Sequence, residues 1–267
     1  MPSDTPAPVI RHDALGREHF LLTLECPAIA REARAGQFVM LQTRQGFDPL
    51  LRRPMSICRV LPGRRGRIEI LYKVVGEGTR CLSQQTVGAR VATLGPLGNG
   101  FRLPPDGTRP ILVSGGIGIA IFPFLVDALR AARRAAPLLV YGARGKGDLV
   151  ALDFFRKRRV PIRLATEDGS VGTKGFVTRI LEPVLAGRAD AGPMEIFACG
   201  PTPMLKAVGA MAQGAGVPCQ LALESQMPCG IGVCLGCVVP CPADERGPIF
   251  RRVCTEGPVF DAREVVL

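Results

Sequence analysis

The spacing of four cysteines near the carboxyl-terminal end restricts what this chain can fold into more than any other feature. Cys229, Cys234 and Cys237 follow the pattern C-x4-C-x2-C, and Cys254 follows after sixteen further residues. This spacing is typical of plant-type 2Fe-2S centres, in which a loop wraps the cluster and the fourth thiolate arrives from a distance. Three glycines lie within the loop: Gly230, Gly232 and Gly236. Because glycine can adopt positive φ and bring backbone N–H groups close to the cluster sulfurs, the pattern predicts a 2Fe-2S cluster bound by these four thiols.

Cys241 competes with Cys254 for this assignment. It lies between two prolines shortly after Cys237, and we expect it not to bind, because the spacing with Cys254 matches the plant-type pattern. A zinc site is the alternative for the whole group, although zinc more often uses two C-x2-C pairs. The isolated cysteines are expected to be small core residues: Cys26, Cys58, Cys81 and Cys219.

Size and composition indicate a globular protein of more than one domain. The 267 residues are 47% hydrophobic, which is enough for two packed cores. Ten cysteines would suit a secreted disulfide scaffold, but such scaffolds are far smaller, so we expect a reducing cytoplasm.

The longest apolar stretch, 110–126, is interrupted by Ser114 and three glycines and falls short of the roughly 18 apolar residues of a spanning helix. The start of the chain also lacks the pattern of a signal peptide, so we expect no membrane partner.

The formal net charge of +11 raises the question of nucleic-acid binding. The basic residues occur in small groups, without interleaved aromatic residues and without the pattern of a recognition helix. We therefore expect a solvated basic surface and no nucleic-acid partner.

Two changes in pattern divide the chain into predicted domains 1–104, 105–224 and 225–267. In the first, closely spaced short strands predict an antiparallel barrel or sandwich, with strands at 19–24, 37–43, 54–60 and 67–74 and a helix at 79–85. In the second, strands alternate with helices and predict a parallel sheet wrapped by helices, with strands at 111–113, 138–141, 162–165 and 195–198 and helices at 119–134, 176–185 and 203–213. The third has no long amphipathic element and needs an external staple to hold its shape.

A candidate phosphate-binding motif lies in the barrel-like domain. Arg53, Pro54, Met55 and Ser56 occupy a predicted strand, where an arginine fork can grip a pyrophosphate and a nearby hydroxyl can bond the same ligand or a flavin ring. Leu71, Tyr72 and Lys73 lie on the next strand, and Gly78 and Thr79 open a short helix whose free N–H groups suit a phosphate. Each piece by itself is also compatible with a surface ion pair or an ordinary glycine turn.

A second candidate site lies in the α/β domain. Gly115, Gly116 and Gly118 follow a predicted strand and precede a helix, the layout in which a dinucleotide diphosphate rests on a helix N-terminus. The full G-x-G-x-x-G pattern is missing, and the next strand ends at Arg144 rather than at an acidic residue. Cys199 and Gly200 end another parallel strand, where ligands of such sheets bind. We do not expect Cys199 to be a nucleophile, because the two histidines, His12 and His19, belong to the first domain.

These three motif sets, in this order, resemble the ferredoxin-NADP reductase superfamily with a C-terminal 2Fe-2S domain. Within it, the chain is most similar to the electron-transfer subunits of class 1B dihydroorotate dehydrogenases, and the resemblance covers nearly the whole chain. Four further phrases carry it: Ala35-Gly36-Gln37-Phe38-Val39, the run from Leu71 to Thr79, Thr166-Glu167-Asp168-Gly169, and Leu223-Glu224.

The resemblance implies a fold, cofactors and a partner. It implies an antiparallel flavin-binding barrel, a parallel-sheet nucleotide-binding domain and a small iron-sulfur domain. FAD would be held by the residues from Arg53 to Ser56, from Leu71 to Lys73, and by Gly78 and Thr79, and NAD by the second domain. Electrons would pass between NAD(H), FAD, the 2Fe-2S cluster and FMN in a separate catalytic subunit that oxidises dihydroorotate to orotate in pyrimidine (UMP) biosynthesis, in a heterotetramer of two copies of each subunit. The chain would then be an oxidoreductase subunit without a dihydroorotate site of its own.

Some points stay open at this level. Relatives often continue the glycine turn with Ala-Pro, whereas this chain places its proline at Pro123. Arg144 and Lys146 could bind the 2′-phosphate of NADP, although the resemblance favours NAD. One alternative is the small reductase subunit of a sulfide dehydrogenase or an NADH-dependent ferredoxin-NADP oxidoreductase. The other is a zinc-stapled, basic nucleic-acid-binding module.

Overall fold

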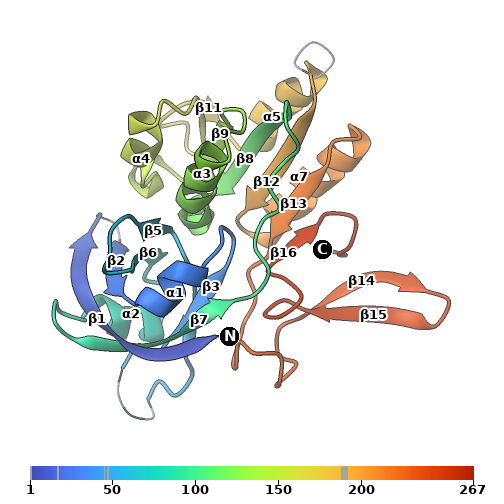
Figure 1. Cartoon of the computed structure of the whole chain (residues 1–267). Helices are drawn as coiled ribbons and strands as arrows, with labels where there is room; N and C mark the ends of the chain where they lie inside the picture. The colour runs from blue at the N-terminus through green and yellow to red at the C-terminus, as the bar shows by residue number, and fades with distance from the viewer. Residues whose placement is uncertain (1, 17, 45, 47, 188–191) are drawn as a thin grey trace.

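A strongly curved antiparallel sheet of seven strands forms the amino-terminal part of the molecule (Figure 1). The computed structural model describes residues 2–16, 18–44, 46, 48–187 and 192–267. The strands lie in the order β4-β3-β7-β1-β2-β6-β5. They are β1 (Ser3–Ala14), β2 (His19–Glu25), β3 (Phe38–Leu41), β4 (Arg53–Ser56), β5 (Arg59–Leu61), β6 (Arg67–Lys73) and β7 (Arg90–Leu97).

This first sheet closes toward a barrel because its two edge strands are consecutive in the chain. The predicted strand over 54–60 is two strands in the structure: β4 pairs with β3, whereas β5 pairs with β6. Between them, Ile57 N–H donates to Gln37 O on the β3 side, and Cys58 N–H donates to Glu69 O on β6. Residues 57 and 58 therefore carry the chain from one edge of the sheet to the other, which curls the sheet around its apolar core.

Alternating burial explains why these segments form strands. In β7, Val91, Thr93, Gly95 and Leu97 are buried and alternate with more exposed residues, as expected for a sheet with one face on a core. The core inside the curved sheet is mainly aliphatic and includes Leu22, Leu24, Val39, Ile68 and Ile70. Two short helices, α1 (Pro27–Glu32) and α2 (Glu77–Ser83), connect strands of this sheet.

A second seven-stranded sheet follows, in the order β11-β10-β9-β8-β12-β13-β16. All its neighbouring strands are parallel except the last pair, β13 and β16. The strands are β8 (Arg109–Gly115), β9 (Leu138–Ala143), β10 (Ile162–Thr166), β11 (Thr173–Lys174), β12 (Met194–Cys199), β13 (Cys219–Ala222) and β16 (Val259–Asp261). This is the parallel sheet predicted from the alternation of strands and helices.

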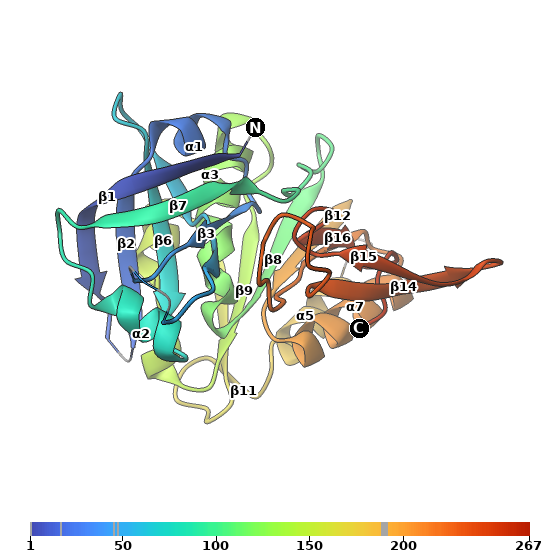
Figure 2. The same ribbon diagram turned by 90° about the horizontal axis from the view of Figure 1, so that it is seen from below.

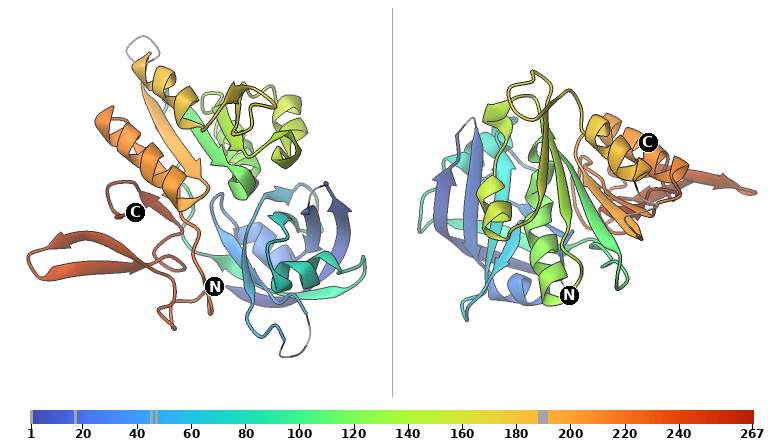
Figure 3. Two further views of the ribbon diagram at one scale, coloured as in Figure 1. Left: turned by 180° about the vertical axis from the view of Figure 1, so that it is seen from behind. Right: turned by 90° about the horizontal axis from the view of Figure 1, so that it is seen from above.

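Helices cover both faces of this sheet (Figures 1 and 3). The helical elements are the 3-10 helices η1 (Gly116–Ile121) and η2 (Lys146–Asp148) and the α-helices α3 (Phe122–Ala131), α4 (Leu152–Lys157), α5 (Thr178–Ala186) and α7 (Thr202–Gly214). Successive residues of β8 serve the two faces: Ile111 and Val113 belong to the core that includes α5 and α7, and Leu112 to the core that includes α3. Burial on both faces explains the uninterrupted apolar run of this strand.

The predicted helix over 119–134 is shorter and starts differently. Residues Gly116–Ile121 form a 3-10 turn, and the α-helix begins at Phe122 with Pro123 in its first turn. Proline is favoured there because the N–H that it lacks would have no helical partner. The helix ends at Ala131, and Arg133 follows with a φ of 54°, a left-handed conformation common at helix ends. The displaced proline noted in the sequence thus marks where the α-helix starts.

The carboxyl-terminal region contains the cysteine loop and a hairpin that projects from the body of the molecule (Figure 2). The hairpin consists of β14 (Val238–Asp244) and β15 (Gly247–Arg252), a feature that the sequence did not predict. Val239, Val253 and Cys254 at its base belong to the same hydrophobic core as Val113 of β8. Because this core is continuous and β16 extends the second sheet, the third region is packed onto the second.

Candidate functional site

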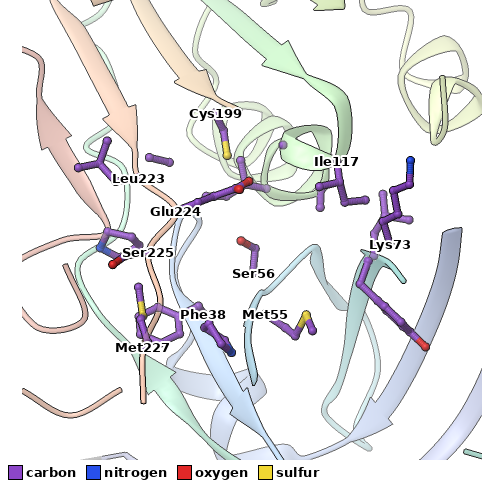
Figure 4. A pocket seen from close by; sticks show the side chains of 18 of the residues that line it. Phe38, Met55, Ser56, Lys73, Ile117, Cys199, Leu223, Glu224, Ser225 and Met227 are labelled. Carbon is purple, nitrogen blue, oxygen red and sulfur yellow. The ribbon is translucent and has the colours of Figure 1, made fainter. Parts of the chain in front are cut away.

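A cavity of about 300 Å³ lies between the two sheets (Figure 4). We call it the interdomain cavity. In Figure 4, Met55 and Ser56 of β4 approach it from the first sheet, and Ile117 and Cys199 from the second. Glu224, in the segment that leads to the cysteine loop, forms a third side. Ser225 and Met227, which follow Glu224, also line the cavity, so residues of all three predicted domains bound it.

Most of the candidate residues from the barrel motif line this cavity. Those lining it are Pro54, Met55, Ser56, Leu71, Tyr72, Lys73 and Thr79, together with Gly118 and Cys199 of the second motif set. The fold thus brings together side chains from β4, β6, α2, η1 and β12 that are far apart in the sequence. The other candidate residues are not among those that line this cavity: Arg53, Gly78, Gly115, Gly116 and Gly200.

Arg53 and Gly78 pack directly against each other. A Cβ atom on Gly78 would overlap the Arg53 guanidinium, and Arg53 Nη1 donates to the carbonyl of Leu51. The Thr79 hydroxyl accepts hydrogen bonds from Val75 N–H (2.9 Å) and Gly76 N–H (3.2 Å). Thr79 therefore shapes the loop before α2, and Gly78 leaves room for the arginine. This explains why the motif needs these residue types together.

Lys73 links the first sheet to the second domain. Its Nζ lies 3.1 Å from Asp148 Oδ1 in η2, and the two side chains are 29% and 15% exposed. A second link joins Arg59 of β5 to Asp127 of α3 at 3.2 Å, and Arg158 contacts the same carboxylate at 2.7 Å. These partly buried pairs bridge the two domains.

Several residues that line the cavity were missed by sequence reasoning. They come from β3, η1, the segment after β13 and the turn before β16: Phe38, Ile117, Leu223, Glu224, Ser225, Met227 and Pro258. Phe38 and the Leu223-Glu224 pair belong to segments that carry the family resemblance, and Ile117 lies within the glycine turn, but none of the seven was singled out as a site residue. Only the folding of the chain brings them together here. The position of Met227, two residues before Cys229, could have suggested a link between the cavity and the cluster loop.

Cys199 and Glu224 are ionisable groups of the cavity whose pKa values are changed by their surroundings. Burial raises the pKa of the Cys199 thiol, and the nearby Glu224 carboxylate raises it further. Partial burial likewise raises the pKa of Glu224 above that of a free glutamate. Cys199 therefore remains a neutral thiol at neutral pH, which fits the expectation that it is not a nucleophile.

A second cavity, of about 430 Å³, lies at the carboxyl ends of the central parallel strands. We call it the strand-end cavity. It is lined by Gly115 and Gly116 after β8, by Arg144 after β9, by Glu167 after β10 and by Phe176 before α5. Ligands of open α/β sheets bind at this edge. The second strand ends without an acidic residue, but Glu167, directly after the third strand, places a carboxylate at this edge of the sheet.

The glycine turn separates the two cavities. Gly118 lines the interdomain cavity, and a Cβ atom there would overlap the backbone of Cys199. A Cβ atom on Gly115 would lie 2.6 Å from Met204 Sδ, and one on Gly200 would lie 2.7 Å from Met204 Cε. Gly116, with a φ of 53°, has no neighbour within 4 Å of its Cβ position and faces open space. The turn therefore needs glycines for close packing at 115 and 118 and for backbone conformation at 116.

The cysteine loop presents backbone N–H groups to its own sulfurs. Ile231 N–H donates to Cys229 Sγ at 3.5 Å, Gly236 N–H to Cys234 Sγ at 3.5 Å, and Cys254 N–H to Cys237 Sγ at 3.4 Å. Gly230 and Gly232 have φ values of 72° and 82°, as expected for a loop that folds back on itself. Such donors suit thiolates that carry negative charge in an iron-sulfur cluster.

The four candidate thiols interact in two pairs. Cys234 helps to lower the pKa of Cys229, whereas Cys237, and to a smaller extent Cys229, raises the pKa of Cys254. Within the described ranges, no group of three or more His, Cys, Asp or Glu side chains converges on a point suited to one metal ion. Two pairs of thiols with backbone donors fit the two irons of a 2Fe-2S cluster.

Local hydrogen bonds make one of these thiols unusually acidic. Partial burial raises the pKa of Cys229, but hydrogen bonds from the backbone around Cys234 and Ile231 outweigh it and lower the pKa to about 6. Cys254 is deeper, and burial together with its Cys237 neighbour raises its pKa to about 11. Cys241 is buried on β14, where its Sγ lies 3.8 Å from Val239 O. Its expected spectator role stays a prediction.

Comparison with known proteins shows the relatives of this chain. Residues 224–266 match the family described as the iron-sulfur cluster binding domain of dihydroorotate dehydrogenase B. The chain is 40% identical over 249 residues to the dihydroorotate dehydrogenase B (NAD(+)) electron transfer subunit of Desulforamulus reducens, covering 92% of both chains. It is 37% identical to the protein of the same name from Geobacillus thermodenitrificans, covering 97% of both.

Solved structures show the same architecture. A chain of the NADH-dependent reduced ferredoxin-NADP oxidoreductase, described in connection with flavin-based electron bifurcation, superposes with a TM-score of 0.84 at 28% identity, covering all of this chain and 91% of that one. Phthalate dioxygenase reductase superposes with a TM-score of 0.66 at 19% identity, over 94% of both chains, and shares the fold.

The fold and site define a reductase of the ferredoxin-NADP reductase type with an added iron-sulfur region, as the sequence predicted. More particularly, the chain belongs to the family of dihydroorotate dehydrogenase B electron transfer subunits. The expected cofactor set of FAD, a 2Fe-2S cluster and NAD is confirmed by these matches, which also favour iron-sulfur over zinc. In the part of the chain that the structure describes, no helix has the length and apolar character needed to span a membrane.

Proposed function

We propose that this chain transfers electrons between NAD(H) and a separate FMN-containing subunit that oxidises dihydroorotate to orotate in pyrimidine (UMP) biosynthesis. The strand-end cavity takes NAD, the interdomain cavity takes FAD, and the cysteine loop takes the 2Fe-2S cluster. A flavin exchanges a hydride with a nicotinamide and single electrons with a cluster, so it has to stand between the two. The interdomain cavity lies between the strand-end cavity and the segment that leads to the cysteine loop, which supports this order.

FAD is assigned to the residues around β4, β6 and α2. Arg53, held against Gly78, supplies a permanently charged fork for the pyrophosphate, and Ser56 supplies a hydroxyl within the cavity. The remaining contacts of this proposal come from Pro54, Met55, Leu71, Tyr72, Lys73 and Thr79. The Thr79 hydroxyl already accepts two backbone hydrogen bonds. We therefore assign Thr79 the role of holding the loop before α2 in place, in addition to any contact with the ligand.

NAD is assigned to the glycine turn and the strand ends. Gly115 and Gly116 line the strand-end cavity, where they allow close approach of a diphosphate. Gly118 completes this part of the proposal by keeping the turn close to β12, which ends at Cys199 and is followed by Gly200. Arg144 and Glu167 face the same cavity with opposite charges. The names of the relatives favour NAD over NADP as the nucleotide.

The observation that carries this proposal is the position of the interdomain cavity between the other two sites. On one side, Gly118 belongs to the turn that also lines the strand-end cavity. On the other, Ser225 and Met227 line the cavity only a few residues before Cys229. Ligands in the two cavities would thus meet at the glycine turn, and the segment 223–227 would connect the flavin site directly to the cluster loop.

An exposed apolar surface on the cluster loop supports the existence of a protein partner. Ile231, Val233 and Leu235 are 49%, 76% and 60% exposed, although their neighbours Cys229 and Cys234 are proposed ligands. Electron transfer requires close approach, so we assign this surface to the catalytic subunit, in a heterotetramer with two copies of each chain. The domain boundaries that we propose are 1–104 for FAD, 105–224 for NAD and 225–267 for the cluster.

The experiment is an anaerobic NADH titration of the chain co-purified with its genomic neighbour, with flavin, iron and sulfide assayed on the same sample. We expect bleaching of a flavin band, a 2Fe-2S EPR signal and dihydroorotate-dependent reduction of NAD. A colourless protein that contains zinc and no flavin would refute the proposal.

Two cysteine variants provide a matched pair. Cys229→Ser removes a proposed ligand and should abolish the EPR signal while flavin remains bound. Cys241→Ser changes a buried cysteine of the same region that we assign no ligand role, and it should leave iron at about two per chain. Loss of iron in the Cys241 variant with retention in the Cys254→Ser variant would exchange the roles of these two residues.

The similarity to the NADH-dependent ferredoxin-NADP oxidoreductase chain favours one second candidate. In that case the chain would be the small reductase subunit of another flavoprotein complex, such as that enzyme or a sulfide dehydrogenase. Its cofactor content would be the same, but the complex would show no activity with dihydroorotate. The substrate of the co-purified partner therefore separates the two candidates.

A further inference from the structure

Three aromatic rings lie against one another on adjacent strands of the first sheet. Tyr72 of β6 is paired with Phe20 of β2 in the sheet register, and their rings stack with centroids 5.6 Å apart at 19°. His12 of β1 completes the group, with its ring centroid 5.5 Å from that of Phe20 and 6.1 Å from that of Tyr72. Tyr72 also lines the interdomain cavity, so this aromatic group forms part of the support behind the cavity wall.

Hydrogen bonds fix the tautomer of His12. Its Nδ1 lies 2.8 Å from the carbonyl oxygen of Gln85, and its Nε2 lies 2.8 Å from the Tyr72 hydroxyl. A carbonyl oxygen can only accept, so Nδ1 carries the hydrogen, and in the neutral ring Nε2 is then an acceptor. The Tyr72 hydroxyl must therefore donate to His12.

The Tyr72 hydroxyl depends on this acceptor. Tyr72 is 2% exposed, and His12 Nε2 is the hydrogen-bond partner that the described structure gives its hydroxyl. Burial raises the pKa of the Tyr72 phenol, which keeps it protonated and able to donate at neutral pH. A buried hydroxyl without a partner is costly, so loss of the histidine acceptor would favour other positions of the ring.

We propose that His12 is a positioning residue for the flavin site: its Nε2 accepts the Tyr72 hydroxyl and fixes the side chain of Tyr72, a residue that lines the cavity and packs into the core of the first sheet, before the ligand binds. The inference rests on the proposed function, because it takes the ligand of the interdomain cavity to be FAD. A ring that is already immobilised does not have to be ordered on binding, which increases affinity. His12 is far in sequence from every residue that the motifs singled out as cofactor-binding.

A purely structural role for His12 is a distinct alternative. Through Nδ1 it also ties β1 to Gln85, just after α2, and this bond could matter for the fold alone. The two roles use different nitrogens of the same ring. Substitutions that imitate one nitrogen at a time therefore distinguish them.

The matched variants are His12→Gln and His12→Asn. The glutamine amide reaches about as far as Nε2 and can still accept from Tyr72, whereas the asparagine amide reaches about as far as Nδ1 and can only replace the bond to Gln85. We expect His12→Gln to bind FAD within about twofold of the wild type, and His12→Asn about threefold to tenfold more weakly. Tyr72→Phe should resemble His12→Asn, and the double variant should show no further loss.

The readouts are the FAD dissociation constant, from flavin fluorescence, and the NMR signals of ring-labelled tyrosine in the full chain. The chain has two tyrosines and no tryptophan, so the Tyr72→Phe variant identifies the Tyr72 signal. That signal should keep its position in His12→Gln and shift or broaden in His12→Asn, before FAD is added.

Thermal unfolding of each variant controls for folding. Equal FAD affinity in the two histidine variants, or weaker binding by His12→Gln than by His12→Asn, overturns the positioning role and assigns His12 to the fold alone. If the wild-type chain itself binds no FAD, the proposed function fails together with this inference. If it binds FAD but the variants do not follow the expected order, only this inference fails.

Discussion

Replacing Gly118 with alanine tests whether the glycine turn has to stay close to β12. Gly118 does not have a positive φ, so space alone restricts the position. An added Cβ would lie 2.6 Å from the carbonyl carbon of Cys199 and 2.9 Å from Gly200 N. Both neighbours are backbone atoms and cannot rotate away, so the turn and the end of β12 have to separate by several tenths of an ångström.

The cost follows from this overlap. Overpacking of a tightly packed site costs about 1–3 kcal/mol, which should lower Tm by about 5 °C in a chain of this size. The same movement shifts the two cavities relative to each other, and misplacement of reacting groups by about 1 Å can slow a reaction by about 100-fold. We therefore expect NADH to reduce the bound flavin about 10- to 100-fold more slowly.

Stopped-flow absorbance at the flavin band measures this rate, and thermal unfolding measures stability. Gly209→Ala is the control, because its Cβ would lie 3.6 Å from Ala262 and Leu221, an ordinary contact, inside helix α7. Alanine is favoured over glycine in a helix by up to about 1 kcal/mol, so this variant should be at least as stable as the wild type. A Gly118→Ala protein with wild-type Tm and wild-type flavin reduction would refute the packing argument.

Two further predictions concern ion pairs. Asp148→Asn removes the partner of Lys73 across the domain interface. Because the pair is partly exposed, we expect the free energy of unfolding, measured by urea denaturation, to fall by about 0.5–1 kcal/mol. A gain in stability would contradict the bridging role. The hydrogen bond from Arg263, with smaller contributions from the charges of Arg263 and Arg102, holds the pKa of Asp261 below its usual range. The ionised Asp261 side chain therefore stabilises the fold at any pH above the pKa that Asp261 has in the unfolded chain. This stabilisation disappears as the pH falls through the lower pKa of the folded state. Asp261→Asn should therefore be less stable than the wild type by about 0.5–1 kcal/mol at pH 7 and equal to it in strong acid, and a difference that persists at low pH would show that the charge is not responsible.

The proposed cluster site could largely be predicted from the sequence, because most of its proposed ligands are close together in the chain. Three of the four proposed thiols lie within nine residues, and the glycines between them give the loop its shape. The spacing therefore carries the chemistry directly. The pairing of Cys229 with Cys234 and of Cys237 with Cys254 needed the structure, because Cys254 reaches the loop only after the β14–β15 hairpin returns.

Only part of the lining of the two cavities could be predicted from the sequence. Motifs identified β4, β6 and the glycine turn, since arginine and glycine have recognisable roles at such positions. In the sequence, Glu167 belonged only to a segment that carries the family resemblance. It became a candidate binding residue because β10 ends beside β9. No motif singled out His12, and its contact with Tyr72 depends on the alignment of β1, β2 and β6.

The sequence by itself determined the classes of element, the cofactor types and the four thiols, because helix and strand periods, glycine turns and cysteine spacing are local properties of the chain. Only the tertiary structure decided that Ser56, Cys199 and Met227 share one cavity. Their contact results from the curling of the first sheet and from the packing of the third region on the core of the second. Burial of apolar surface drives that packing, and it depends on the whole set of faces rather than on any one segment.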